Sequence, residues 1–467
     1  MLLRVTYPEV AVEDYYPLLS SQLVDELKSL AHEVKDLRFV HLNSTAIGGG
    51  VAEILQSLVP MMNALGVHTE RVVINPPPQF FQVTKKLHNT LQGAEGTLSK
   101  DELGLYLNTI QDVANDMQQR SLDADIWFFH DPQLLPLASM LPKQPNETRL
   151  WVCHIDLTAP NQSVIDQLLP LTSAYDGLVF SLDAYVPAGL DPSLPVFIVP
   201  PAIDPLTDKN VPLSEAEALK IVSKMGVDPK RPLITQVSRF DLWKDPWGVI
   251  DAYRIARKEV AGLQLALLGL SQAIDDPESL QVRDQVAQYA EDDPDIHLYF
   301  DATGLPVSID RVVNAFQVAS QVVMQKSLRE GFGLTVAEAM WKARPLIGGD
   351  VGGIRIQVED GVTGYLVKSP EECAQRIVSL LKDPELRTRM GRAARESVRQ
   401  RYLLPRLAVD YLKAALARRA NINGQSGLNG NRPNGFADLE HLRLEDAAPA
   451  KAAVKVRAKR SKGRSAA

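Results

Sequence analysis

The sequence predicts an α/β protein with two doubly wound domains, each a parallel sheet between layers of helices. Three observations lead to this fold class. The chain has 467 residues, too many for one ordinary hydrophobic core. Short apolar runs alternate with helical stretches, first over residues 37–199 and again over 232–367. Between these halves, the segment from Pro200 to Pro205 interrupts the pattern and indicates a hinge or linker.

We place the N-terminal domain at residues 1–208 and the C-terminal domain at 209–399. Residues 421–467 are expected to be disordered, because Asn and Gly dominate the start of this segment. After Pro449 the tail contains seven Lys or Arg and no acid. Two interpretations stay open, a solubilising tail or weak, salt-sensitive binding to nucleic acid or an anionic surface.

The composition excludes several other classes of protein. The net charge of −7 argues against general nucleic-acid binding outside the tail. Cys153 and Cys373 lie too far apart in the sequence to suggest a disulfide framework or a metal-ligand spacing, which favours a reducing compartment. The N-terminus lacks a basic start followed by an apolar run, so we expect no signal peptide. No stretch approaches the roughly 18 apolar residues of a membrane span. We therefore expect a soluble, cytoplasmic protein.

The first domain begins with a β-α-β pattern. Residues 11–36 have leucines at helical spacing and predict a surface helix, and residues 37–42 predict a strand. The segment Asn43-Ser-Thr-Ala-Ile-Gly-Gly-Gly50 then leads into a helix over 51–59, followed by a strand over 67–74. This layout is typical of a phosphate-binding turn, although it matches neither the dinucleotide fingerprint nor a P-loop. A tight packing point is the alternative.

Residues 75–93 form an unusual segment, with three prolines, two phenylalanines and several polar side chains. Loops and helices of this kind on α/β sheets often contact the substrate. The alternative is a surface excursion without function. The candidate ligand-binding residues here are Lys85, Lys86, His88, Asn89 and Gln92.

Two predicted strands of the first domain end in a His and an Asp. Residues 126–129 lead to His130 and Asp131, and residues 150–153 lead to His154, with Asp156 two positions later. The carboxyl ends of parallel strands are where such folds bind their ligands. No His-x-x-x-His spacing supports a metal site, and we expect none. Strands over 178–180 and 196–199 complete the first sheet.

The second domain has a pair of cations at its first strand. Residues 232–237 predict a strand, and Arg239 and Lys244 follow on one strand-to-helix loop. Two such cations can hold a diphosphate, each contributing about 4 kcal/mol at an effective dielectric near 20 before desolvation. A solvated basic pair is the alternative. Further strands are predicted over 263–269, 296–300, 321–324, 345–347 and 365–367, and helices over 278–291, 312–320 and 371–417.

The stretch from Glu330 to Glu338 has two carboxylates eight residues apart. Gly331 and Gly333 suit a loop that must approach a ligand closely, and the pattern becomes helical from Leu334. A helix start offers free N–H groups to an anion. Acids on both sides of such an anion site suit a nucleotide sugar, which has a diphosphate between two sets of hydroxyls. Two solvated glutamates on a glycine-capped helix are the alternative.

With these motifs, the chain resembles the retaining GT-B glycosyltransferases of family four from about residue 38 to 415. That family has two Rossmann-like domains facing a central cleft, and a C-terminal helix, here about 400–420, is expected to pack back on the first domain. Longer strings, such as Ser-Thr-x-x-Gly-Gly-Gly-Val-Ala-Glu, His-Asp-Pro-Gln and Arg-Glu-Gly-Phe-Gly-Leu-Thr-Val, resemble the trehalose glycosyltransferring synthases of that family. Those enzymes join glucose from a nucleoside-diphosphate glucose to free glucose.

The resemblance implies a role for each candidate residue. Arg239 and Lys244 would hold the diphosphate and neutralise the leaving group, while His154 and Asp131 would line the reacting sugar. Glu330 would bind donor-sugar hydroxyls and Glu338 the ribose hydroxyls. The remaining nucleotide-sugar contacts would come from Gly49, Gly50, Phe332, Gly333, Leu334 and Thr335. The acceptor side would involve Lys85, His88, Asn89, Gln92 and Asp131.

The implied activity is a retaining transfer without a cofactor or a strictly required metal. The expected partners are small molecules (nucleoside-diphosphate glucose, glucose and trehalose), and a homodimer is left open. Three alternatives also stay open: a trehalose phosphorylase, a transferase with another acceptor, and a nucleotide-sugar sensor without catalysis. A sugar-phosphate acceptor would need extra cations, which Lys85 and Lys86 could supply.

Overall fold

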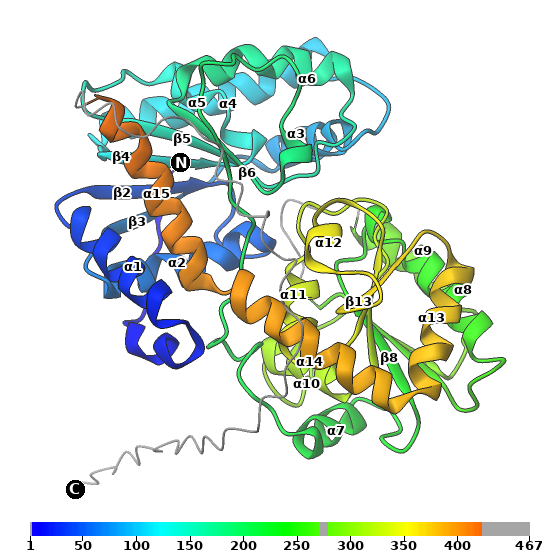
Figure 1. Cartoon of the computed structure of the whole chain (residues 1–467). Coiled ribbons are helices and arrows are strands. Elements are labelled where there is room, and N and C mark those ends of the chain that lie inside the picture. The colour runs from blue at the N-terminus through cyan, green and yellow to red at the C-terminus, as the bar shows by residue number, and fades with distance from the viewer. Residues whose placement is uncertain (1, 271–278, 423–467) are drawn as a thin grey trace, which may run out of the picture. The chain divides into compact units, whose positions relative to one another are not determined.

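The computed structural model describes residues 2–270 and 279–422 (Figure 1). These residues form two sheets, one parallel except for its edge strand β1 and one entirely parallel, both covered by helices, so the predicted α/β fold with two doubly wound sheets is confirmed. We call the layers around the seven-stranded sheet the first lobe and those around the six-stranded sheet the second lobe. Apart from Asn421 and Ile422, which end the last helix, the predicted disordered tail lies outside the described residues.

The first sheet has the order β1-β3-β2-β4-β5-β6-β7. Its strands are β1 (Leu2–Arg4), β2 (Arg38–Asn43), β3 (His68–Ile74), β4 (Ile126–His130), β5 (Thr148–Cys153), β6 (Gly177–Phe180) and β7 (Val196–Ile198). The sequence did not predict β1, which pairs antiparallel with β3 at the sheet edge. A strand of three residues is too short to show an alternating pattern.

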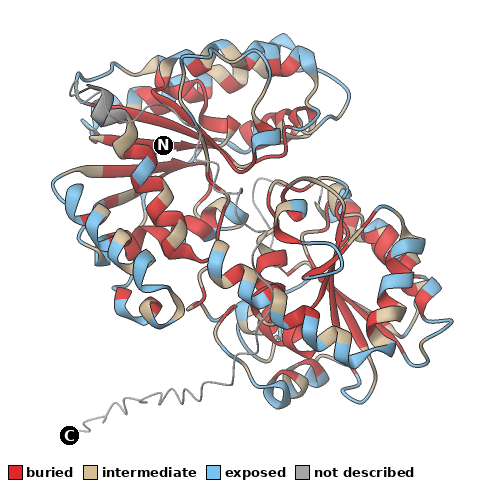
Figure 2. Cartoon of the chain, viewed as in Figure 1, coloured by how far each residue is buried: buried red, intermediate tan, exposed pale blue. Residues whose placement is uncertain are grey.

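Strand residues of the first sheet alternate between two hydrophobic cores. On β4, Trp127 and Phe129 belong to the core under α3 (Pro78–Leu91) and α4 (Lys100–Gln119). Ile126 and Phe128 belong to the core on the opposite face. Both faces of the sheet are therefore buried (Figure 2), as expected for a parallel sheet between helices. Shorter helices complete this lobe: α5 (Leu137–Met140), α6 (Gln162–Leu168), η2 (Pro132–Leu134), η3 (Leu169–Ala174) and η4 (Asp183–Tyr185).

The opposite face is covered by α1 (Ser21–Glu33), α2 (Gly50–Ala64) and α15 (Leu404–Ile422). The prediction of one helix over 11–36 was wrong, because η1 (Val12–Leu18) precedes α1. Pro17 lies in η1, and the side chain of Ser20 caps α1 by accepting a hydrogen bond from the Leu23 N–H.

The second sheet is entirely parallel, with the order β10-β9-β8-β11-β12-β13. Its strands are β8 (Leu233–Val237), β9 (Gln264–Leu268), β10 (Ile296–Tyr299), β11 (Val322–Gln325), β12 (Leu346–Gly349) and β13 (Gly364–Val367). The helices are α7 (Glu215–Lys224), η5 (Leu242–Lys244), α8 (Pro246–Ala256), α9 (Ser279–Ala290), α10 (Ile309–Ala319), α11 (Leu334–Trp341), α12 (Gly352–Gln357), α13 (Pro370–Lys382) and α14 (Pro384–Arg401).

The predicted helix over 371–417 is in fact three helices. Asp383 ends α13 and caps α14, and Pro384 occupies the first turn of α14. After Tyr402 the chain returns to the first lobe as α15, which packs against α1, α2 and β5 (Figure 1). No helix within residues 2–270 and 279–422 combines the length and the apolar composition needed to span a bilayer.

Each sheet has a point where its strand order reverses. In the first sheet the chain runs from β2 outward to β3 and then returns to β4 on the other side of β2. In the second sheet it runs from β8 outward to β10 and returns to β11 beside β8. Each reversal lies between two adjacent strands, β2 and β4 in the first sheet and β8 and β11 in the second. The loops after these four strands start at Ser44, Asp131, Ser238 and Lys326. Doubly wound sheets bind ligands at such reversal points, so the fold positions all four candidate loops for one site.

Candidate functional site

A lysine–glutamate pair joins the two reversal-point loops of the second lobe. Lys244 Nζ donates to Glu330 Oε2 at 2.6 Å, and Ser327 Oγ donates to the same oxygen at 3.0 Å. Glu330 is only 7% exposed. Gln325 Nε2 donates to it as well, at 3.4 Å. The carboxylate is thus fixed by three donors, and it in turn fixes the lysine ammonium beside the start of α11.

Gln236 on β8 holds these two loops together. Its Nε2 donates to the Lys244 carbonyl at 2.9 Å, and its Oε1 accepts from the Lys326 N–H at 2.9 Å. The side-chain amide is 1% exposed and bonds to both loops at once. Sequence reasoning did not single out this residue; a glutamine next to Thr235 in a largely apolar strand was the available signal.

A second cluster of charge surrounds Asp241. Lys85 Nζ of α3 donates to Asp241 Oδ2 at 3.0 Å, and Arg239 Nη2 lies 3.8 Å from the same oxygen. Burial alone would raise the pKa of Asp241, but the charges of Lys85, Arg239 and Lys244 outweigh it and keep that pKa below its usual range. The structure therefore gathers three cations from both lobes around one carboxylate.

The acceptor-side candidates on α3 have various partners. Asn89 Oδ1 accepts from Trp243 Nε1 of the second lobe at 3.3 Å, and His88 Nε2 lies 3.2 Å from Gln133 Oε1. Gln92 is the residue that ends α3. Lys86 pairs with both carboxylate oxygens of Glu102, at 2.9 and 2.8 Å. Lys85 and Lys86, the two cations that could have met an acceptor phosphate, thus both have a carboxylate partner.

A buried arginine anchors the glycine-rich loop between β2 and α2. Arg71 of β3 is 1% exposed and donates to Asn43 Oδ1 at 2.9 Å and to the Thr45 carbonyl at 2.7 Å. It also donates to the carbonyls of Ala46 and Ala52. One side chain therefore fixes the loop at both ends, which a local reading of the sequence could not show.

The glycine loop meets the start of α11. Gly49 has φ +79°, in the left-handed region that suits glycine, and a Cβ there would meet nothing within 4 Å. A Cβ at Gly50 would lie 3.4 Å from Leu334 Cδ1. The first residues of α2 and α11 are therefore neighbours; that the N–H groups of both helix starts bind one anion stays a prediction.

Asp131, at the reversal point of the first sheet, contacts His154, which follows the neighbouring strand β5. The His154 N–H donates to Asp131 Oδ1 at 3.1 Å, and Trp151 Nε1 donates to the Asp131 carbonyl at 3.0 Å. Asp131 has φ 66° and ψ 166°, a conformation that costs a non-glycine residue free energy. Strain of this kind, held by surrounding hydrogen bonds, occurs most often at functional sites.

The two lobes touch where His154 meets Gly331. A Cβ on Gly331 would lie 2.2 Å from the His154 carbonyl oxygen. Nearby, Tyr185 Oη donates to the Glu330 carbonyl at 2.7 Å. The first-lobe residues thus contact the Glu330 loop directly, so the reacting sugar proposed for both groups would lie where they meet.

This contact makes Gly331→Ala a sharp test of the site. The new methyl group would clash with a backbone atom, which cannot rotate away, so the two loops must separate. We expect kcat to fall roughly 10²-fold, the usual cost of about 1 Å of misplacement. Initial-rate kinetics of the purified variant measure this effect. The control is Gly104→Ala in α4, where a Cβ meets nothing within 4 Å and activity should stay unchanged. Equal activity of both variants would contradict the assigned geometry.

Glu338 lies one turn into α11 and has no exposed surface. Its Oε1 accepts no hydrogen bond among the described residues and lies 3.6 Å from Lys209 Nζ. Lys209 also bonds to Glu53 of α2 at 2.6 Å, and burial raises the pKa of Glu53 to about 7. Because Glu338 Oε1 accepts no hydrogen bond among the described residues, it is chemically suited to a hydroxyl, and its contact with ribose stays a prediction.

Three histidines of the first lobe are neutral in the folded protein. Burial lowers the pKa of His154 to about 4 and that of His41 to about 3, where the charge of Arg71 contributes further. Burial, and after it the neighbouring His41, His154 and Arg71, also hold the pKa of His130 well below its ordinary value. At neutral pH these rings can donate and accept hydrogen bonds but bear no charge.

The depressed pKa values predict a loss of stability in mild acid. Unfolded histidine takes up a proton near pH 6.5, whereas folded His154 does so only near pH 4. The unfolded chain therefore binds more protons in this window, and the free energy of unfolding should fall as the pH falls from about 6.5 towards 4. Each such histidine contributes a slope of about 1.4 kcal/mol per pH unit. Urea unfolding at several pH values measures the slope, and His41→Phe should reduce it; an unchanged slope in that variant would contradict the assignment.

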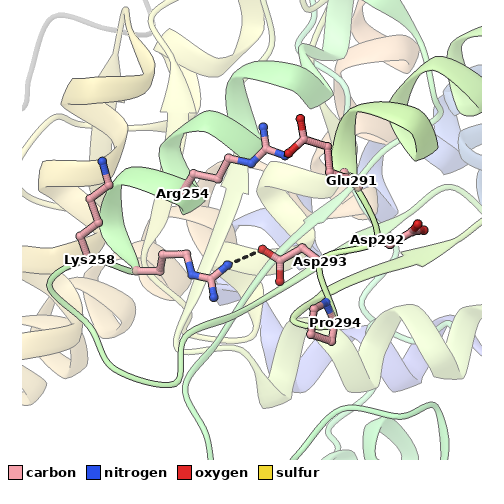
Figure 3. Close-up of a pocket in the computed structure, with 8 residues that line it drawn as sticks. Arg254, Lys258, Glu291, Asp292, Asp293 and Pro294 are labelled. Carbon is pink, nitrogen blue, oxygen red and sulfur yellow. Dashed lines mark hydrogen bonds and ion pairs between the residues drawn. The ribbon is translucent and has the colours of Figure 1, made fainter.

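A surface hollow of about 680 Å³ lies elsewhere on the second lobe (Figure 3). It is formed by the end of α8 and the turn before β10, at the amino edge of the sheet, opposite to the candidate site. Arg254 lies 3.3 Å from Glu291, and Arg257 pairs with Asp293, so its charges largely neutralise one another. We assign no function to this hollow.

Two family models match the chain. The model for the N-terminal domain of trehalose synthase matches residues 41–187, and the model for group 1 glycosyl transferases matches residues 219–397. The first match contains the glycine loop and His154, and the second contains Arg239 and Glu330. Each matched region therefore contains the candidate site residues of one lobe that are named here.

Relatives and solved structures agree with these matches. The chain is 43% identical over 415 residues to a trehalose synthase of Rubrobacter xylanophilus, covering 88% of this chain and 98% of that protein. It is 29% identical over 420 residues to a trehalose phosphorylase of Grifola frondosa, covering 81% of this chain and 56% of that protein. The structure of sucrose-phosphate synthase from Thermosynechococcus elongatus matches with a TM-score of 0.63 at 17% identity, covering 83% and 100% of the two chains. The last likeness concerns the fold alone.

Proposed function

Since this chain belongs to the trehalose synthase family of glycosyltransferases, we propose that it transfers glucose from a nucleoside-diphosphate glucose to free glucose and forms trehalose. Membership of this family shows that the chain is a trehalose-related glycosyltransferase. The donor, the acceptor and the stereochemistry are our proposal. We further propose that the anomeric configuration of the donor glucose is retained.

The observation that carries this proposal is the arrangement around Lys244 and Glu330. A cation held by a carboxylate at 2.6 Å lies beside the start of α11, and Arg239 belongs to the same loop as Lys244. A diphosphate would accept hydrogen bonds from both cations and from the free N–H groups of α2 and α11. Glu330 would accept hydrogen bonds from the sugar hydroxyls on one side of the diphosphate. Cations for a diphosphate next to a carboxylate for sugar hydroxyls are the groups that a nucleotide sugar needs.

The proposed reaction breaks the bond between the glucose C1 and the diphosphate oxygen. Positive charge develops on the sugar ring and negative charge on the departing diphosphate, so Arg239 and Lys244 bind the transition state more strongly than the ground state. The 1-hydroxyl oxygen of the acceptor glucose forms the new bond to C1 on the same face. Its proton passes to the departing phosphate, and the products are trehalose and a nucleoside diphosphate.

The first lobe would supply the sugar-facing groups. His154 is neutral at physiological pH and can hydrogen-bond a donor-sugar hydroxyl, for instance that on C6. Asp131 would line the same sugar. We propose no covalent intermediate on the enzyme, since none of the carboxylates that we assign is clearly placed as a nucleophile.

A neutral acceptor fits the charges better than a phosphorylated one. Lys85 is bound to Asp241 at 3.0 Å, and Lys86 to Glu102 at 2.8 Å. Each ammonium charge is already offset by its carboxylate, which weakens its attraction for a phosphate, whereas the hydroxyls of free glucose need only ordinary donors and acceptors. We therefore favour glucose as the acceptor.

The decisive experiment is a product assay. Purified protein is incubated with UDP-glucose or ADP-glucose plus glucose, glucose 6-phosphate or glycerate, and the sugars are separated by thin-layer chromatography. We expect trehalose from glucose, with release of nucleoside diphosphate. A parallel reaction of trehalose with inorganic phosphate tests the phosphorylase alternative. Glucose 1-phosphate in that reaction, without product from any nucleotide sugar, would overturn the proposal.

A further inference from the structure

Three histidines from neighbouring strands form a row on one face of the first sheet. His41 lies on β2, His130 ends β4 and His154 directly follows β5, and these strands are adjacent in the order β2-β4-β5. In the sheet, His41 of β2 is paired with Phe128 of β4, which lies two residues before His130. His130 in turn is paired with Val152 of β5, which lies two residues before His154. Because side chains alternate between faces, a stagger of two residues keeps all three rings on the same face.

The rings are joined end to end by hydrogen bonds. His41 Nδ1 lies 2.9 Å from His130 Nε2, and His130 Nδ1 lies 3.0 Å from His154 Nε2. Successive ring centroids are 5.2 and 5.3 Å apart. His41 and His130 are fully buried, whereas His154 is partly exposed. The row therefore begins in the core and ends at the candidate site.

Only two proton arrangements satisfy both hydrogen bonds when all three rings are neutral. A neutral imidazole has one donor and one acceptor nitrogen, so each ring must donate in the same direction as its neighbour. In one arrangement all three protons are on Nδ1, and in the other all three are on Nε2.

The two arrangements differ in what they leave at the buried end. His41 Nε2 is buried and has no hydrogen-bond partner among the described residues. With protons on Nδ1, this atom is an unused lone pair; with protons on Nε2, it is an N–H without an acceptor. Buried N–H groups without an acceptor are rarer than incompletely used acceptors. The first arrangement is therefore favoured.

We infer that His41 and His130 are positioning residues that keep the proton of His154 on Nδ1, so that this ring offers a hydrogen-bond donor to the ligand. The backbone of His154 is fixed at the same time by its N–H bond to Asp131 Oδ1. Under the proposed function, the donor meets a hydroxyl oxygen of the donor glucose; the proton arrangement itself does not depend on that function. The row begins at a buried nitrogen of His41 that has no hydrogen-bond partner among the described residues, so it orients a proton and does not conduct one.

Nuclear magnetic resonance can observe the arrangement directly. The protein, with ¹⁵N in its histidine rings, is studied at pH 7 by long-range ¹H–¹⁵N correlation, which shows which ring nitrogen bears the proton. The chain has eight histidines, and His41→Phe, His130→Asn and His154→Gln assign the three signals by their loss. We expect Nδ1 to be protonated in all three rings. A proton on Nε2 of His154, or exchange between both nitrogens, would overturn the inference.

A matched pair of variants separates positioning from packing. In His130→Asn, the side-chain amide can still donate to His154 Nε2, while His130→Leu fills the space without a hydrogen bond. We expect kcat/KM to stay within about threefold in the Asn variant and to fall roughly three- to tenfold in the Leu variant, the effect of one neutral hydrogen bond. The stability order should be the opposite, since a buried amide is costlier than leucine. If activity instead follows stability, with Leu above Asn, the histidines only pack and the inference fails.

The two experiments also separate this inference from the proposed function. If no nucleotide sugar yields trehalose but His154 bears its proton on Nδ1, the function fails and the proton arrangement stands. If trehalose forms but the proton is on Nε2, the arrangement fails and the function stands.

Discussion

Replacing Arg239 with alanine should lower turnover roughly 10²–10³-fold, the cost of losing one preorganised group that stabilises developing charge. Arg239 lies on the loop after β8 beside Lys244, and its charge should matter most when the diphosphate departs. The loss should therefore appear mainly in kcat, measured from initial rates at saturating donor and acceptor. Arg239→Lys keeps the charge but loses the two-pronged geometry, and we expect an intermediate rate.

The control for this variant is Arg231→Ala, just before the same strand. Arg231 lies at the amino edge of the sheet, where it pairs with Asp295 at 2.6 Å and bonds to the Gly262 carbonyl. Its removal should leave kcat within about twofold. Near-normal turnover in Arg239→Ala would count heavily against a diphosphate site at this loop.

Replacing Arg71 with leucine should destabilise the protein by roughly 3–5 kcal/mol, because the buried guanidinium satisfies several oxygens that would lose their donor. Those oxygens include Asn43 Oδ1 and the carbonyl of Thr45. Guanidinium chloride unfolding measures the loss. The glycine loop should also become less ordered, so the KM for the nucleotide sugar should rise in the protein that remains folded.

Arg4→Leu on β1 is the matched control. Arg4 is 64% exposed and has an ion pair with Glu70 at 3.4 Å. Exposed pairs of this kind contribute little, so we expect a change within about 0.5 kcal/mol. Equal stability of the two variants would show that Arg71 does not anchor the loop.

The strands of both sheets could be predicted because they are buried on both faces. An apolar run such as Ile126-Trp-Phe-Phe129 followed by polar residues has few alternatives to a central parallel strand. The helix α4 was missed, although Ser99 and Glu102 form a capping box at its start that the sequence displays. This capping box is enough to predict the start of α4 from the sequence.

Other parts of the site could not have been predicted from local patterns. Lys85 and Asp241 are 156 positions apart, and only the contact between the lobes brings them to 3.0 Å. The same holds for Lys209 and Glu53, which approach each other to 2.6 Å. The sequence identified Lys85 as a candidate for ligand binding, but not the carboxylate that already neutralises it. Motif spacing predicts which residues gather at a strand end, whereas pairing across lobes depends on tertiary packing.

The return of α15 to the first lobe has a consequence for how the protein is made. Leu407, Leu412 and Ala415 belong to the same buried core as Phe39 on β2, although the whole second lobe lies between them in the chain. A ribosome that has released only the first two hundred residues exposes an incomplete lobe, with an uncovered apolar face on its sheet. Folding of the first lobe should therefore be complete only after α15 has been synthesised. A fragment cut at the linker should aggregate when it is expressed alone and recover solubility when a peptide of α15 is supplied with it.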